Sequence, residues 1–396
     1  MEDGTVLMGG AFLEAPVHRD LLAPAPFLQY LCAMSIRAAV MTAPEAPLEL
    51  WDLDDPVLEP GSVLLETVAS EVCGTDVHLF HGQLAGVPYP IIPGHVSVGR
   101  VLETRGVEVD ALGMSLGPGD EVTFYDVHET CWSCWHCLVA RQPNRCPSRK
   151  VYGITYSARD GLLGGWAERI YLKPGVKVFR IPPELSADQV IGGGCGLFTG
   201  FAAVDRSGMS MGDTILVQGA GPVGLSAAAF AGLSGASRVL MIGAPESRLD
   251  LARALGVDQA FDLDLTTPEE RKDRILTLTG GRGPDVVIEA AGHPSAVPEG
   301  LSLLRDGGTY VVVGHYSDVG EVSVNPHLDV NRKHARILGQ WGTDFHHLAR
   351  ALTLLARHSE ALPLDRIVGK TYPLEEAGQA LADVEALRVT KALIAP

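Results

Sequence analysis

The sequence lacks any apolar run long enough to cross a bilayer, and it has no internal repeat and no low-complexity tract. Positive charge is scarce: 31 Lys and Arg residues face 48 Asp and Glu residues, which gives a net charge of −17. This balance argues against a nucleic-acid or an anionic-membrane partner. Hydrophobic residues make up 46% of the 396 residues, so the chain can bury the cores of two ordinary domains.

Cysteine is also rare, and the odd number of seven argues against a disulfide framework. Cys131, Cys134 and Cys137 are spaced C-x-x-C-x-x-C, and Cys146 follows them. Four thiolates in one short lobe can close a tetrahedral shell around zinc, which is typical of a structural site. Free thiols are the alternative, but four of them near solvent would be prone to oxidation. The pattern favours metal and predicts a reducing, cytoplasmic compartment.

A second group of potential ligands begins with Cys73 and His95, each beside a glycine. A thiolate and an imidazole suit a zinc site that keeps one position open. For this pair alone, a buried thiol and an unrelated surface imidazole are an equally good interpretation. Cys195 lies in a glycine-rich stretch, residues 192–200, and is a candidate third ligand or a small buried hydrophobe.

Polar residues just after Cys73 extend this hypothesis. The Asp76 carboxylate is placed to hold the ligand imidazole in one tautomer. The hydroxyl of Thr75 and the imidazole of His78 can pass a proton from the metal to solvent. We expect loops around Val127, residues 152–156 and Trp341 to form walls of the substrate pocket.

The chain changes character at its middle. Residues 36–182 contain short β-rich segments separated by Gly and Pro, which predicts a barrel-like β domain. A strand over 214–218 is then followed by Gly219-Ala220-Gly221-Pro222-Val223-Gly224 and an Ala-rich helix, which is GxGxxG in the context it requires. Strands and helices alternate from there to residue 314, which predicts a doubly wound parallel sheet that binds a dinucleotide.

Taken together, the order Cys-Gly-Thr-Asp, Pro-Gly-His, four-cysteine lobe, Gly-Cys-Gly and GxGxxG resembles the zinc-dependent medium-chain alcohol dehydrogenases. The likeness covers residues 34–396. It implies an α/β fold with a GroES-like catalytic domain, residues 34–196 and 341–396, and a Rossmann NAD(P)-binding domain, residues 197–340. Residues 1–33 are expected to be a loose N-terminal extension, because Met34 reads like a natural start. The resemblance also implies a homodimer or a homotetramer.

The resemblance assigns site residues position by position. It gives Cys73, His95 and Cys195 as ligands of a catalytic zinc, and Cys131, Cys134, Cys137 and Cys146 as ligands of a structural zinc. It gives Thr75 and His78 as a proton relay, with Asp76 as the partner of the ligand histidine. It gives Gly219, Gly221, Pro222, Val223, Gly224, Gly243, Thr199, Val313 and Lys391 as cofactor-binding positions, with Lys391 at the pyrophosphate.

The implied reaction is hydride transfer between a small-molecule alcohol, secondary or cyclic, and NAD or NADP, which gives a ketone or an aldehyde. A polyol or amino-alcohol dehydrogenase with the same zinc site is an alternative. A non-catalytic NAD(P)-binding protein is an alternative of another class, and the presence of both Cys73 and His95 counts against it.

Three positions depart from the family pattern. Val96 follows His95 where the family usually has Glu, which removes a carboxylate near the metal and any ligand exchange through it. Cys146 comes one residue later than usual. Gly243 stands where an acid is expected after the second Rossmann strand.

The third departure bears on cofactor choice. A carboxylate at this point normally bonds the ribose hydroxyls of NAD, and Gly243 cannot do so. We expect Glu246 to reach the ribose from the loop and Arg248 to lie on the helix surface. The sequence therefore predicts weak discrimination with a slight preference for NAD, which Gly243→Asp should sharpen.

Overall fold

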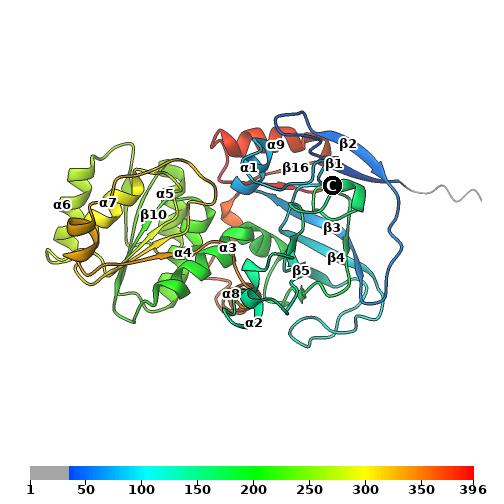
Figure 1. Cartoon of the computed structure of the whole chain (residues 1–396), viewed down its shortest axis with the longest axis horizontal. Helices are drawn as coiled ribbons and strands as arrows, with labels where there is room; N and C mark the ends of the chain where they lie inside the picture. The colour runs from blue at the N-terminus through cyan, green and yellow to red at the C-terminus, as the bar shows by residue number, and fades with distance from the viewer. Residues whose placement is uncertain (1–34) are drawn as a thin grey trace, which may run out of the picture. The chain divides into compact units, whose positions relative to one another are not determined.

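The computed structural model describes residues 35–396, and most of its strands belong to two large sheets (Figure 1). The two sheets and their helices agree with the predicted α/β class. The predicted extension, residues 1–33, lies outside the described part of the chain. Within residues 35–396, no helix has both the length and the apolar character that crossing a membrane requires.

One sheet has six parallel strands in the order β12-β11-β10-β13-β14-β15. They are β10 (Thr214–Gln218), β11 (Arg238–Gly243), β12 (Gln259–Asp262), β13 (Val286–Glu289), β14 (Thr309–Val312) and β15 (Arg336–Gly339). Its central strands are almost wholly buried, as expected for a parallel sheet covered on both faces. The strand order reverses between β10 and β13, where ligands bind beyond the carboxyl ends of the strands.

Four helices alternate with these strands and pack on them. They are α4 (Pro222–Leu233), α5 (Glu246–Ala254), α6 (Pro268–Leu278) and α7 (Ala296–Leu303). The first of these contacts β10 and β11, and α5 contacts β11 and β12. Proline in the first turn of α4 and of α6 suits a position whose N–H has no helical partner.

The other large sheet is mostly antiparallel, with the order β16-β17-β3-β4-β5-β9 and β8 paired to β3. Its strands are β3 (Val63–Val72), β4 (Ser97–Thr104), β5 (Glu121–Phe124), β8 (Arg169–Leu172), β9 (Val178–Arg180), β16 (Val368–Tyr372) and β17 (Lys391–Ile394). The last strand of the chain pairs with β3, so Ala392 lies opposite Val72. The domain boundaries at 196/197 and 340/341 stay predictions.

Two short strand pairs and several α-helices lie outside these two sheets. Two further pairs of strands are β1 (Ile36–Val40) with β2 (Glu49–Leu53), and β6 (Val127–His128) with β7 (Lys150–Val151). The remaining α-helices are α1 (Gly74–Phe80), α2 (Trp135–Leu138), α3 (Ala187–Ser207), α8 (Phe345–Arg357) and α9 (Ala377–Glu385).

The glycine-rich stretch at 192–200 lies inside helix α3, which the sequence did not predict as a helix (Figure 1). Glycine lowers helix propensity, and tertiary packing overrides that preference here. A Cβ on Gly200 would lie 2.6 Å from the backbone nitrogen of Ala227 in α4, so glycine allows the two helices to pack closely. The helix is kinked at Gly194, where φ is +51°. This kink carries Cys195 toward β3.

Candidate active site

Three residues predicted as ligands of a catalytic zinc lie together. Cys73, His95 and Cys195, together with Glu71, each place one potential ligand atom within 4.8 Å of the others. Cys73 follows β3 and caps α1, His95 precedes β4, and Cys195 lies in α3. Segments that are far apart in the sequence therefore form one buried cluster.

Local backbone structure fixes two of these side chains. Cys73 Sγ accepts the Thr75 N–H at 3.3 Å, and the Cys73 N–H is donated to Asp76 Oδ2 at 2.9 Å, which forms a capping box at α1. Gly94 has a φ of +86°, and a Cβ there would lie 2.3 Å from the nearest side-chain atom. Glycine at this position lets His95 come close to β3.

The electrostatics of the cluster suit a divalent cation. Burial lowers the pKa of His95, but the Cys73 thiol and the Glu71 carboxylate outweigh it, and the pKa is raised to about 9. His95 Nε2 faces the cluster, 3.5 Å from Glu71 Oε1. Two thiol groups and one imidazole are donors that zinc prefers. The residues present therefore fit zinc.

Asp76, the predicted partner of His95, has a different contact. Its Oδ2 accepts the Cys73 N–H, and its Oδ1 is buried without a hydrogen-bond partner. A hydrogen bond to His95 is not found among the described residues, and His95 Nδ1 is also unpartnered. Burial raises the pKa of Asp76 to about 6. Asp76 fixes the start of α1, and its role toward His95 stays a prediction.

Glu71 is a member of this cluster that the sequence analysis missed. It lies in β3 and is fully buried. Its Oε1 accepts the Cys195 N–H at 3.0 Å, and its Oε2 accepts Lys391 Nζ at 2.7 Å. The one sequence signal was an acid two residues before Cys73 in a largely apolar strand. Val96 removes the carboxylate that the family pattern places after His95, and Glu71 brings a different carboxylate to the same cluster.

Lys391, predicted at the pyrophosphate, lies beside Glu71. Its Nζ is fully buried beside Glu71 and also donates to the Gly193 carbonyl at 3.1 Å. Lys391 does not line either cavity that contains the predicted cofactor residues. The pairing of β17 with β3 brings this ammonium group to the candidate zinc ligands, and its contact with the pyrophosphate stays a prediction.

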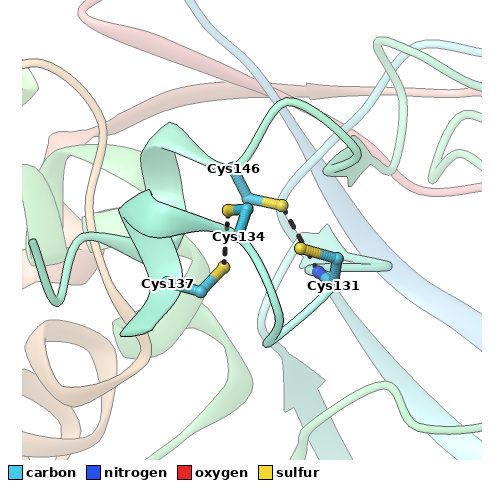
Figure 2. Close-up of side chains that lie close together, drawn as sticks. All are labelled: Cys131, Cys134, Cys137 and Cys146. Carbon is cyan, nitrogen blue, oxygen red and sulfur yellow. Dashed lines mark hydrogen bonds between the residues drawn. The ribbon is translucent and has the colours of Figure 1, made fainter. Parts of the chain in front are cut away.

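The four-cysteine lobe is also assembled (Figure 2). The thiol groups converge, and one ligand atom from each lies within 4.8 Å of the other three. Cys134 Sγ and Cys137 Sγ lie 3.6 Å apart, close to the roughly 3.8 Å expected for two thiolates on tetrahedral zinc. Hydrogen bonds from Ser133 lower the pKa of Cys131 to about 6, which favours its thiolate. A helical turn just before Cys146 accommodates the longer gap. These donors fit a closed zinc site.

One cavity of about 330 Å³ joins the ligand cluster to the predicted nicotinamide residues. The predicted site residues that line it are Cys73, Thr75, His78, His95, Cys195, Thr199, Val223 and Val313. The candidate metal ligands, the candidate proton-relay residues and the candidate cofactor contacts therefore face the same cavity.

The relay candidates Thr75 and His78 enter this cavity from α1. His78 Nδ1 contacts Gln83 Oε1 and lies 3.3 Å from Ser317 Oγ. Thr75 and His78 make no direct hydrogen bond among the described residues. A proton relay between them therefore requires an intervening group, and their role stays a prediction.

The glycine-rich turn between β10 and α4 is tightly packed. Gly219 has a φ of +106°, and a Cβ on Gly224 would lie 1.9 Å from the Gly219 carbonyl oxygen. Gly221 caps α4 and Pro222 occupies its first turn. The free N–H groups at this helix start form an anion site of the kind that binds a pyrophosphate. Gly219, Gly221 and Gly243 line a second cavity of about 720 Å³.

Two expectations about this second cavity are reversed. Arg248 is 9% exposed and lines the cavity beside Gly243, instead of lying on the helix surface. Glu246 does not line it, because its carboxylate is bound to Arg253 at 2.7 Å. Arg248 therefore lines this cavity, together with Asp264 and Glu299, whereas Glu246 does not.

Aromatic and charged groups form other walls of the 330 Å³ cavity. Trp341 stacks on Tyr316 with ring centroids 5.5 Å apart and planes at 9°. The Arg149 guanidinium lies 5.3 Å from the centroid of the Trp341 ring. Asp126 is buried, and burial raises its pKa. Val127, Ile154 and Trp341 line the cavity as expected, whereas Tyr152 and Tyr156 pack in the core of the antiparallel sheet.

Comparison with known proteins adds two family matches. Residues 59–183 match the model of the alcohol dehydrogenase GroES-like domain, and residues 222–357 match that of the zinc-binding dehydrogenases. The chain is 33% identical to the 5-exo-hydroxycamphor dehydrogenase of Pseudomonas putida over 362 residues, which cover 90% of this chain and 98% of the relative. It is 30% identical to the erythritol/L-threitol dehydrogenase of Mycolicibacterium smegmatis over 346 residues, 82% of this chain and 88% of the relative.

Solved structures of dehydrogenases also resemble this chain. An alcohol dehydrogenase from Thermotoga maritima superimposes with a TM-score of 0.87 at 33% identity, over 92% of this chain and 100% of that one. A zinc-binding dehydrogenase from Sinorhizobium meliloti 1021, solved with NADP bound, gives a TM-score of 0.77 at 27% identity, over 91% of this chain and 100% of that one.

Proposed function

The chain belongs to the zinc-dependent medium-chain alcohol dehydrogenases, and from this premise we propose that its substrate is a secondary alcohol with a ring. The enzyme transfers a hydride between an alcohol and NAD(P). One observation carries the proposal: the three candidate zinc ligands and the candidate nicotinamide contacts face the same 330 Å³ cavity. A substrate in that cavity would meet the metal and the cofactor together.

The cavity walls support a ring-shaped substrate. Val127, Ile154 and Trp341 offer apolar surface, which suits a hydrocarbon ring. The relative from Pseudomonas putida is named for a hydroxylated camphor, and it covers nearly the whole chain.

We assign Cys73, His95 and Cys195 to the catalytic zinc, and the four cysteines of the lobe to the structural zinc. Zinc bound at the first site would act as a Lewis acid that makes a substrate hydroxyl more acidic. The Thr75 hydroxyl, which lines the cavity, would accept the proton of the substrate hydroxyl while it donates its own proton onward. The His78 imidazole, which lines the same cavity, would deliver a proton to solvent.

The glycine-rich turn and the start of α4 would hold the pyrophosphate of the cofactor. No carboxylate follows β11, and Arg248 lines the second cavity beside Gly243. We therefore propose that NADP is used at least as well as NAD, which revises the slight preference for NAD expected from the sequence.

A polyol or amino-alcohol substrate is the second candidate. Asp126 and Arg149 both line the cavity, and a carboxylate and a guanidinium can bind further hydroxyl, ammonium or carboxylate groups of a substrate. Relatives named as erythritol/L-threitol dehydrogenase and L-threonine 3-dehydrogenase favour this alternative.

We also propose a cytoplasmic homodimer or homotetramer. The free cysteines that lie in the two ligand clusters suit a reducing compartment. Light scattering at micromolar concentration tests the assembly, and a monomer would contradict it.

An oxidation screen tests the substrate class. Borneol-type bicyclic alcohols, cyclohexanol, erythritol and L-threonine are compared with both cofactors as kcat/KM. We expect the bicyclic alcohols to exceed erythritol and threonine by at least about tenfold, which corresponds to about 1.4 kcal/mol. The reverse order would establish the polyol or amino-alcohol alternative and refute the ring proposal.

A further inference from the structure

Glu71 lies at the proposed catalytic zinc site, yet no role has been assigned to it. Its side chain and that of Lys391 are both completely buried, and they form an ion pair at 2.7 Å. Burial of two charges is unfavourable unless their mutual attraction and additional hydrogen bonds compensate for the lost hydration. A buried pair that touches the ligand cluster therefore calls for a functional explanation.

The distances within the cluster match a tetrahedral site with four protein donors. Glu71 Oε1 lies 3.5 Å from His95 Nε2, and one atom from each of the four side chains lies within 4.8 Å of the rest. Two ligands that are each about 2.1 Å from a tetrahedral zinc lie roughly 3.4 Å apart. The carboxylate is thus at ligand distance from the imidazole, without any movement of β3.

From this geometry we propose that Glu71 is a fourth protein ligand of the catalytic zinc, and that the substrate oxygen displaces it. The inference rests on the proposed function, because it requires zinc at Cys73, His95 and Cys195. It also explains why Val96 is tolerated beside His95: the carboxylate of this site comes from β3.

The surroundings of Glu71 make the exchange reversible. A catalytic zinc needs an open position, so one of four protein ligands must be able to leave. A carboxylate can accept about four hydrogen bonds, so Glu71 can bind Lys391 and the Cys195 N–H whether or not it also binds the metal. When Glu71 leaves the metal it is therefore not an unpaired buried charge.

The kink in α3 makes space for the Glu71–Lys391 ion pair. A Cβ on Gly194 would lie 2.0 Å from Glu71 Oε2 and 2.2 Å from Lys391 Nζ. Its φ of +51° also favours glycine. Gly194 therefore makes room for the pair and sets the direction of the following residue, Cys195.

Cobalt(II) provides the test, because its visible spectrum reports the ligands of a site directly. The cobalt-substituted parent is compared with Glu71→Gln and with the matched control Glu66→Gln, an exposed acid of the same strand that pairs with Arg100. The four-cysteine site is identical in all three proteins and cancels in difference spectra. We expect Glu71→Gln alone to change the substrate-free spectrum, and the difference to disappear when imidazole occupies the exchangeable position.

Release of the catalytic zinc to EDTA gives an independent readout. We expect Glu71→Gln to release zinc at least about tenfold faster than the parent, and Glu66→Gln to release it at the parental rate. Spectra and release rates of Glu71→Gln that equal those of the parent would overturn the proposal. A parent that takes up no cobalt outside the four-cysteine site would instead refute the catalytic zinc assignment.

The double variant Glu71→Gln/Lys391→Met covers the case in which the single variant does not fold. Removal of both charges leaves no unpaired buried ion, and such replacements are often well tolerated. We expect the double variant to show the same spectral change and the same rapid zinc release. A folded double variant with parental spectrum and release rate would overturn the proposal.

Discussion

Gly243 and Ala220 lie against each other where β11 and β10 end. A Cβ on Gly243 would lie 2.6 Å from the Ala220 Cβ and 3.0 Å from the Ala220 nitrogen. Side-chain atoms do not approach this closely in a packed interior, so any larger residue at 243 must displace the glycine-rich turn. The missing acid is therefore tied to the packing of the turn as well as to cofactor choice.

Gly243→Asp should consequently weaken both cofactors. The new side chain pushes on Ala220 and moves the turn that holds the pyrophosphate, so we expect KM to rise for NAD and for NADP. This reverses the expectation from sequence alone, which was a sharper preference for NAD. Steady-state kinetics with both cofactors distinguish the steric expectation from the sequence-based one. An improved kcat/KM for NAD would contradict the steric argument.

Arg248→Gln should lower the use of NADP selectively. A hydrogen bond to a charged group contributes about 1.5–3 kcal/mol, so kcat/KM for NADP should fall by about tenfold or more, with a much smaller change for NAD. Arg253→Gln is the control, because Arg253 lies on the same helix and binds Glu246 and Asp250 at the surface. Equal losses for the two cofactors would mean that Arg248 does not face the 2′-phosphate.

The two zinc sites should respond differently to loss of one cysteine. Elemental analysis of the parent should give two zinc ions per chain. Cys137→Ser should lower the melting temperature, because a structural metal contributes folding free energy. Cys195→Ser should abolish activity with a smaller effect on melting. If both variants keep full activity and the parental melting temperature, the zinc assignments are wrong.

His78→Gln should slow alcohol oxidation more at neutral pH than at high pH. Hydroxide can take the proton directly at high pH, and general-base assistance matters less there. We expect up to about a hundredfold loss in kcat near pH 7 and a smaller loss near pH 10. His81→Gln is the control, because His81 ends the same helix and binds Glu385 outside the cavity. A loss that does not vary with pH would indicate a structural role for His78.

His347 should make stability depend on pH. It is 7% exposed, its Nδ1 accepts the Asp344 N–H at 2.9 Å, and its Nε2 lies 4.0 Å from Asp205. Burial, with a contribution from His346, lowers its pKa to about 4. The unfolded chain takes up this proton first, near pH 6.5, so the stabilisation is complete above pH 6.5 and is lost as the pH falls toward 4.

The corresponding variant is His347→Gln, in which the amide oxygen can still accept the Asp344 N–H. Its denaturant midpoint should fall less between pH 7.5 and pH 5 than that of the parent, in which His347 contributes a loss of at most about 2 kcal/mol in the free energy of unfolding. His346→Gln, the exposed neighbour, should keep the parental pH dependence. An unchanged pH dependence in His347→Gln would show that another group titrates.

The sequence alone determined the chemistry of the site and the class of the fold. Cys73, His95 and the four-cysteine lobe are recognisable because ligand type and spacing are local properties, and the strand–turn–helix at Gly219–Gly224 is likewise a local pattern. The alternation of strands and helices follows from local hydrophobic periodicity, and it predicted the parallel sheet. The capping box of Ser186 and Gln189 was the local signal for α3, but its glycines oppose helix formation until packing against α4 compensates for them.

Only the tertiary structure decided which residues surround the ligands. Glu71 meets Lys391 because β3 pairs with β17, and a strand register between segments this far apart leaves no mark in local sequence. Arg248 faces the cofactor cavity because of the way α5 packs on its sheet, and Gly243 is confined by Ala220 of another strand end. Contacts between distant segments depend on how whole elements pack, so residue spacing alone did not reveal Glu71 and assigned Arg248 to the helix surface.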